Sequence, residues 1–211
     1  MSRVVLFSGG ADYTDPWHPF AETSAIVAAI LRADGHETTV VDTLDGLRES
    51  LDSAELLVVN AGGGPAPHPL DDSLADILAG YRGPLLAVHV AATLLPEHGM
   101  WEEAIGGRWV RHVSMHPARG PLRLRAVSSS LPVGDLEPLG TVDEAYSWLR
   151  VSPEAEVLLV HDYDDVEHPV SWILERDGRR SAYTSLGHDP EAYEAPVGVG
   201  MIQRLTRWLV P

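Results

Sequence analysis

Residues 84–91 read Pro-Leu-Leu-Ala-Val-His-Val-Ala, a short apolar run that stops at His89. An apolar run of about four to eight residues is typical of a strand buried on both faces of a parallel sheet. Where such a strand turns sharply into a helix, the residues two positions either side of the apex must be small. Ala87 and Ala91 flank His89 in this way. The stretch therefore predicts a strand ending in a turn that presents His89 above the sheet.

The segments that precede this stretch alternate between strand-like and helix-like patterns. Short apolar runs predict strands, and amphipathic segments with apolar residues three or four apart predict helices between them. Predicted strands cover residues 3–8, 37–42 and 55–60, and predicted helices cover residues 19–35, 44–51 and 70–81. This order predicts an α/β fold whose doubly wound, mostly parallel sheet is covered by helices on both faces.

The second half of the chain is less regular. Residues 99–120 contain two tryptophans and no clean period, so we expect loops and short elements there. Strands are predicted at 122–127, 157–161, 170–175 and 181–185, and a helix at 199–209. The Asp177-Gly178 pair indicates a hairpin between the last two strands. Since no linker or repeat interrupts the pattern, we expect one domain over residues 1–211.

The composition excludes several classes of function. With 31 acidic and 15 basic residues, the net charge of −16 disfavours nucleic acid and anionic membranes as partners. No cysteine is present, so disulfides, thiolate zinc sites and cysteine nucleophiles are excluded. The apolar run near the N-terminus is too short for a signal peptide, and none reaches about 18 residues. We therefore expect a cytoplasmic protein without a membrane span.

Polar residues that follow predicted strands are the first candidates for chemistry, because ligands bind beyond the carboxyl ends of strands in open α/β sheets. His89 is the sharpest of them, since histidine acts as a general base or a metal ligand. The alternative is a strand-end histidine whose ring bonds to a backbone carbonyl. The candidates on this criterion are Ser8, Asp12, His18, Asn60, His89, His161 and His188.

Ten histidines raise the question of a metal site. His112 and His116 are four residues apart, but no HExxH pattern is present, so a zinc helix is not indicated. A site assembled from separated loops stays open, with zinc or manganese as the ions that imidazole and carboxylate ligands suit. No cofactor other than such a divalent metal is indicated.

Two further patterns each allow two interpretations. The glycines at residues 62–64 could offer backbone N–H groups to an anion or a sugar hydroxyl, or form a plain flexible turn. Asp143-Glu144, followed by Tyr146 and Trp148, combines carboxylates with aromatic faces in a way that suits carbohydrate. The alternative is aromatic packing beside surface acids.

Several motifs, in this order, resemble one known family. They are His18-Pro19, the strand that ends at His89, Ile105-Gly106-Gly107-Arg108 with His116-Pro117, Asp143-Glu144-Ala145-Tyr146, Pro169-Val170-Ser171-Trp172, Gly178-Arg179-Arg180 and Tyr183-Thr184-Ser185-Leu186-Gly187-His188-Asp189. This pattern is similar to that of the trehalose-utilisation (ThuA-like) family of the class I glutamine amidotransferase-like superfamily. Val90 departs from it, because in the family a glycine often follows the histidine at the apex of this turn.

The resemblance implies a flavodoxin-like fold with His89 in place of the superfamily's usual cysteine, and therefore no amidotransferase activity. It also implies a role in the metabolism of trehalose, related disaccharides or keto-sugars. From it we expect an enzyme, a sugar hydrolase, isomerase or lyase, acting on a small carbohydrate. The alternatives are a non-catalytic sugar-binding or regulatory protein and a subunit that holds a partner enzyme. Whether the chain forms a homo-oligomer is left open.

We assign the expected site residues on the same basis. The predicted catalytic residues are His89, His188 and Glu144. The predicted substrate-binding residues are His18, His116, Asp189 and Tyr146. The predicted metal ligands are His18, His89, His116 and His188.

Overall fold

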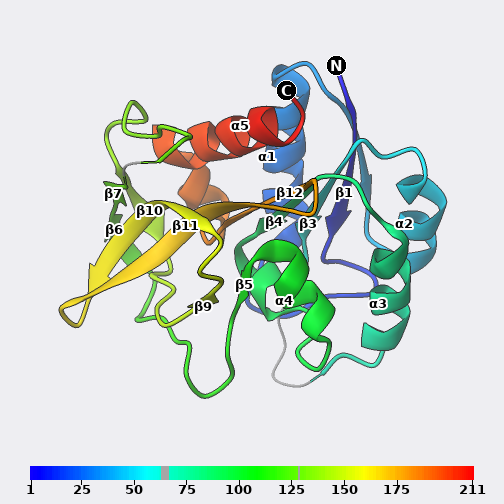
Figure 1. Cartoon of the computed structure of the whole chain (residues 1–211), viewed down its shortest axis with the longest axis horizontal. Helices are drawn as coiled ribbons and strands as arrows, with labels where there is room; N and C mark the ends of the chain where they lie inside the picture. The colour runs from blue at the N-terminus through cyan, green and yellow to red at the C-terminus, as the bar shows by residue number, and fades with distance from the viewer. Residues whose placement is uncertain (63–66, 128) are drawn as a thin grey trace.

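An eight-stranded sheet forms the centre of the protein (Figure 1). The computed structural model describes residues 1–62, 67–127 and 129–211. Five neighbouring strands are parallel, and the three at the other edge are antiparallel to their neighbours. The strand order is β2 (Glu37–Val41), β1 (Arg3–Ser8), β3 (Leu56–Asn60), β4 (Leu85–Val88), β12 (Arg179–Thr184), β11 (Val166–Arg176), β10 (Glu156–Tyr163) and β7 (Arg125–Ala126).

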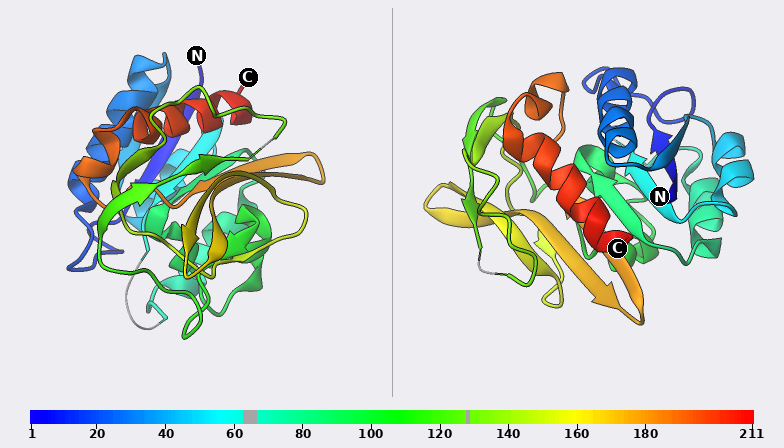
Figure 2. Two further views of the ribbon diagram at one scale, coloured as in Figure 1. Left: turned by 90° about the vertical axis from the view of Figure 1, so that its left-hand side faces the viewer. Right: turned by 90° about the horizontal axis from the view of Figure 1, so that it is seen from above.

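Helices cover both faces of this sheet, as the alternation in the sequence predicted. On one face lie α1 (Phe20–Ala33) and α5 (Pro196–Leu209), which pack against each other (Figure 2). On the other lie α2 (Leu44–Leu51), α3 (Asp71–Gly80) and α4 (Gly99–Ile105). Alternate strand residues enter opposite layers, so Leu6 packs with the first pair of helices and Phe7 with the second group. The predicted doubly wound α/β fold is confirmed.

In the second half of the chain the structure confirms some predicted elements and corrects one. The region expected to be loops and short elements contains a short helix, α4 of seven residues, whose Trp101 and Ile105 bury their side chains against the sheet. The predicted strand at 122–127 is two strands, β6 (Gly120–Arg123) and β7, which pair with different partners. The hairpin at Asp177-Gly178 is confirmed by the antiparallel pairing of β11 with β12.

Two small sheets were not predicted. β8 (Gly140–Asp143) pairs with β6, and β9 (Arg150–Val151) pairs with β5 (Gly107–Arg108). These strands are two to four residues long, too short for a periodic pattern to be recognised. Glu144, one of the predicted site residues, follows directly after β8.

Several polar residues at the strand ends hold the fold together. Asn60 donates hydrogen bonds to the hydroxyls of Thr23 and Ser24, at 3.0 and 2.9 Å. Ser24 in turn donates to Ser8. Asp12 accepts the backbone N–H of Leu44 at 2.6 Å, at the start of α2. These contacts give Ser8, Asp12 and Asn60 structural roles.

Gly63 and Gly64 of the glycine run lie outside the described residues. Within the described ranges, we find no helix that combines the length and the apolar character of a membrane span.

Candidate functional site

Four side chains from four separate segments meet above the carboxyl ends of the parallel strands. His18 precedes α1, His89 follows β4, Glu144 follows β8 and His188 follows β12. One potential ligand atom from each lies within 4.8 Å of every other. We call these four residues the histidine–glutamate cluster. It joins three of the predicted site histidines with the predicted catalytic glutamate.

His89 occupies the predicted apex. Its backbone has φ 48°, the left-handed conformation that a tight turn requires, and its side chain is fully buried. Nδ1 lies 2.6 Å from the carbonyl oxygen of Ser185. A carbonyl only accepts hydrogen bonds, so we assign the ring proton to Nδ1. The lone pair of Nε2 then points into the cluster, 3.2 Å from the Tyr146 hydroxyl and 3.4 Å from Glu144 Oε2.

The two interpretations of His89 drawn from the sequence, a structural histidine and a chemically active one, therefore each apply to one nitrogen of the ring. One nitrogen bonds to a backbone carbonyl, as a structural histidine would. The other is left unprotonated by that same bond and faces the Tyr146 hydroxyl inside the cluster.

His18 is oriented in a similar way by a residue that was not predicted. Its Nδ1 lies 2.8 Å from Asp15 Oδ2, which as a carboxylate accepts the ring proton. Its Nε2 is buried and has no hydrogen-bond partner among the described residues. Burial lowers the pKa of the His18 ring, although Asp15 acts in the opposite direction. A neutral ring with an unsatisfied acceptor nitrogen is the form that binds a metal.

Glu144 lies between the histidines. Its Oε2 is 3.4 Å from both His89 Nε2 and His188 Nδ1, and its Oε1 is 3.6 Å from His116 Nδ1. Burial alone would raise the pKa of the Glu144 carboxyl, but His188 and His89 lower it well below its usual range. In return Glu144 raises the pKa of His188, whose Nδ1 is buried and forms no hydrogen bond of good geometry.

Asp143 holds two segments of the site together and was not predicted as a site residue. Its buried carboxylate accepts the backbone N–H groups of Gly187 at 2.7 Å and His188 at 3.3 Å. It also accepts the N–H of Glu144 at 2.8 Å. Burial raises the pKa of this carboxyl. Its position directly before Glu144 was the only sequence signal for this role.

A cavity of about 680 Å³ opens beside the cluster. This volume is within the range of small-molecule sites. Aromatic rings form much of its wall, and the ring centroids of Trp109 and Tyr146 are 4.8 Å apart in an edge-on arrangement. The lining residues are Pro16, Trp17, His18, Val90, Thr93, Trp109, His116, Glu144, Tyr146 and His188.

The remaining predicted residues differ in their placement. Tyr146 and His116 line the cavity, as a substrate-binding role requires. The histidine–glutamate cluster contains Glu144 and does not contain His116, which was predicted as a metal ligand. His116 Nδ1 lies 2.9 Å from the Pro117 carbonyl oxygen. Asp189 is beside the site but outside the lining, in an ion pair with Arg119 at 2.7 Å. His112 is exposed in a turn, so its four-residue spacing from His116 has no role in the cluster.

Comparison with known proteins supports the resemblance seen in the sequence. A family model described as ThuA, trehalose utilisation, matches residues 3–209. Among curated proteins compared by sequence, none matches significantly.

Solved structures share the fold at low sequence identity. A ThuA-like protein from Parabacteroides merdae superposes with a TM-score of 0.74 at 16% identity, over 99% of this chain and 89% of that chain. A ThuA-like protein from Bacteroides uniformis has a TM-score of 0.66 at 15% identity, over 99% and 90%. A GMP synthase subunit from Thermoplasma acidophilum has a TM-score of 0.54 at 15% identity, over 99% and 98%. The last similarity shows a glutamine amidotransferase-like fold.

Proposed function

This chain belongs to the ThuA family of trehalose utilisation, and on that premise we propose that it is an enzyme that acts on a small sugar or keto-sugar. In this proposal the histidine–glutamate cluster binds one divalent metal ion, zinc or manganese. The cavity beside it binds the carbohydrate.

The convergence of four donor atoms within 4.8 Å is the observation that carries this proposal. Three imidazoles and one carboxylate form a ligand set that suits zinc or manganese. The buried Nε2 of His18 lacks a hydrogen-bond partner among the described residues, and the buried Nδ1 of His188 has only its 3.4 Å contact with Glu144. Unpaired buried polar atoms are costly, and a metal ion would compensate them.

The residues around the cluster have the contacts that metal ligands require. Asp15 and the Ser185 carbonyl each fix the tautomer of one histidine and leave its Nε2 facing inward. When bound, a divalent ion would supply Lewis-acid polarisation of a sugar carbonyl or hydroxyl. Tyr146 directs its hydroxyl to His89, where it can exchange a hydrogen bond with a substrate oxygen.

The wall of the cavity supports a carbohydrate ligand. Trp17, Trp109 and Tyr146 line it together with the polar groups of His116 and Glu144. Aromatic faces pack against the C–H groups of a sugar ring, and polar groups bind its hydroxyls.

Sugar binding without catalysis is the second candidate, and one observation favours it. Glu144 already has contacts with ring nitrogens of His89, His116 and His188, at 3.4, 3.6 and 3.4 Å, that hold its carboxylate in place. A site of this kind can bind a ligand without carrying out a reaction.

Elemental analysis of the purified protein tests the metal proposal. Wild type should contain about one equivalent of zinc or manganese, and His89→Ala and His188→Ala should lose it while circular dichroism shows an intact fold. His112→Ala is the matched control, because this histidine is exposed, and it should retain the metal. Wild type that takes up neither ion when it is added would contradict the proposal.

Turnover then separates the two candidates. The metal-loaded protein is incubated with trehalose and with its keto derivatives, and products are followed by NMR. New products that His89→Ala does not form would support an enzyme. Saturable sugar binding without products would support the binding protein.

A further inference from the structure

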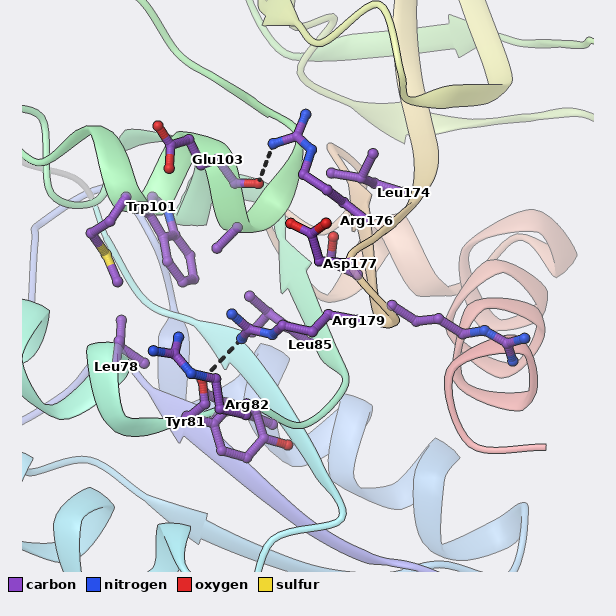
Figure 3. Close-up of a pocket in the computed structure, with 15 residues that line it drawn as sticks. Leu78, Tyr81, Arg82, Leu85, Trp101, Glu103, Leu174, Arg176, Asp177 and Arg179 are labelled. Atoms are coloured by element: carbon purple, nitrogen blue, oxygen red, sulfur yellow. Dashed lines mark hydrogen bonds between the residues drawn. The ribbon is translucent and has the colours of Figure 1, made fainter.

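A second cavity, of about 220 Å³, lies at the opposite end of the sheet from the histidine–glutamate cluster. Leu57, Leu85 and Ser181, near the amino ends of β3, β4 and β12, line it together with residues of α4 (Figure 3). Four arginines also line it, and they come from two segments of the chain, at position 82 and at positions 176–180. Neither the family match nor the proposed metal site accounts for this cavity.

The four arginines differ in their partners. Arg176 pairs with Glu154 at 2.9 Å, and Arg180 pairs with Glu175 at 3.0 Å. In the part of the chain that the structure describes, no ion pair includes Arg82 or Arg179. Arg179 donates one hydrogen bond, to the carbonyl of Tyr81 at 2.9 Å.

These two guanidinium groups repel each other. Burial and the charge of Arg82 together lower the pKa of Arg179. Figure 3 shows both side chains extending along the same side of the cavity, with the Arg179 hydrogen bond to Tyr81 between them. The lining also contains Glu103 and Asp177, but neither forms an ion pair with Arg82 or Arg179. Two guanidinium groups with no ion-pair partner among the described residues therefore line one cavity, in a chain whose net charge is −16.

An anion between the two groups would remove this repulsion. Guanidinium presents parallel N–H donors that match the oxygen atoms of phosphate and carboxylate. The apolar side chains of Leu78, Leu85 and Trp101 bound the cavity, and its volume admits a small molecule but not a polymer. We propose that this cavity is a binding site for a small oxyanion, phosphate or carboxylate, held between Arg82 and Arg179.

Calorimetric titration with sodium phosphate and with sodium acetate, at ionic strength held constant with sodium chloride, tests this site. We expect saturable binding of one of these anions with one site per chain. Binding of phosphate would identify phosphate-type ligands, and binding of acetate would identify carboxylates. Arg82→Gln and Arg179→Gln should each weaken that binding at least tenfold.

Arg48→Gln is the matched control, because Arg48 is exposed on α2 and is not among the residues that line the cavity. It should bind the anion like wild type. Arg82 is also exposed, so Arg82→Gln gives an answer even if loss of the Arg179–Tyr81 hydrogen bond affects folding. The absence of saturable binding of both anions, or equal affinity in wild type and Arg82→Gln, would overturn the proposal.

Discussion

Two acceptors outside the cavity decide which ring nitrogens of the histidine–glutamate cluster face inward. The Ser185 carbonyl binds Nδ1 of His89, and the Asp15 carboxylate binds Nδ1 of His18. In each ring the remaining nitrogen then has a lone pair directed at the centre of the site. The chemistry of the cluster therefore depends on residues that do not themselves reach its centre.

Asp15→Asn tests this dependence. The neutral amide loses the charge that orients His18 and supports its Nδ1 proton, so we expect metal affinity to fall by about 10- to 100-fold. Competition with a chelator measures the change. Asp76→Asn, at an exposed position of α3, is the control and should leave the affinity unchanged. Equal affinity in wild type and Asp15→Asn would show that Asp15 does not support the metal ligand.

At the scale of elements, the hairpin of β10 and β11 holds the segment that carries Tyr146. His161 on β10 and His168 on β11 are paired across the strands, with ring centroids 5.3 Å apart. His161 Nε2 lies 2.9 Å from the Tyr146 carbonyl oxygen. Nδ1 of His168 accepts the backbone N–H of Trp148 at 3.2 Å. Both buried histidines thus hold the backbone of the loop that carries Tyr146, through its carbonyl and the N–H of Trp148.

Protonation of the His168 ring makes the stability of the protein depend on pH. Burial lowers the pKa of this ring below its ordinary value, and a protonated Nδ1 could no longer accept the Trp148 N–H. The unfolded chain binds this proton more readily than the folded protein. Stability is therefore lost as the pH falls below about 6.5, the ordinary histidine pKa, toward the lower pKa of the folded state.

We expect His168→Gln to reduce this loss. Glutamine keeps a hydrogen-bond acceptor for the Trp148 N–H but does not titrate. Thermal unfolding of wild type and variant at pH 7, 6 and 5 measures the difference, with His112→Gln as an exposed control. The Tm of His168→Gln should fall less steeply than that of wild type. Parallel Tm curves for the two proteins would show that His168 does not cause the effect.

At the scale of the whole molecule, the net charge of −16 acts on stability as well as on the choice of partners. Like charges repel across a compact surface, and ions screen this repulsion. The screening length falls from about 30 Å at 0.01 M salt to about 8 Å at 0.15 M. Ion pairs at the surface, such as Arg204–Asp135, contribute little to the free energy of unfolding. Little stability is therefore lost when salt screens them.

We therefore expect sodium chloride to stabilise the protein over this range. The Tm measured by calorimetry should rise between about 0.01 and about 0.15 M salt, because the repulsion is screened over this interval. Sucrose at equal osmolarity controls for effects that do not depend on charge, and its effect should be subtracted. A Tm that stays constant or falls would show that attractive pairs outweigh the net repulsion.

The sequence by itself determined the strands and helices of the first half of the chain and the position of the turn at His89. Strand and helix periods are local properties, so about ten residues are enough to show each one. The small residues Ala87 and Ala91 identified the turn at His89 for the same reason. The motifs in the last quarter placed His188, and Asp143-Glu144 placed the glutamate.

Only the tertiary structure decided which of these residues meet. His18 and His188 are separated by most of the chain, and no local period relates them. The structure brought Glu144, and not His116, into the cluster, because β8 pairs with β6 and delivers it there. It also showed Asp15, Asp143 and the Arg82–Arg179 pair, whose roles depend on packing between distant segments. Distances between loops are set by how the sheet and helices pack, and that information is spread over the whole chain.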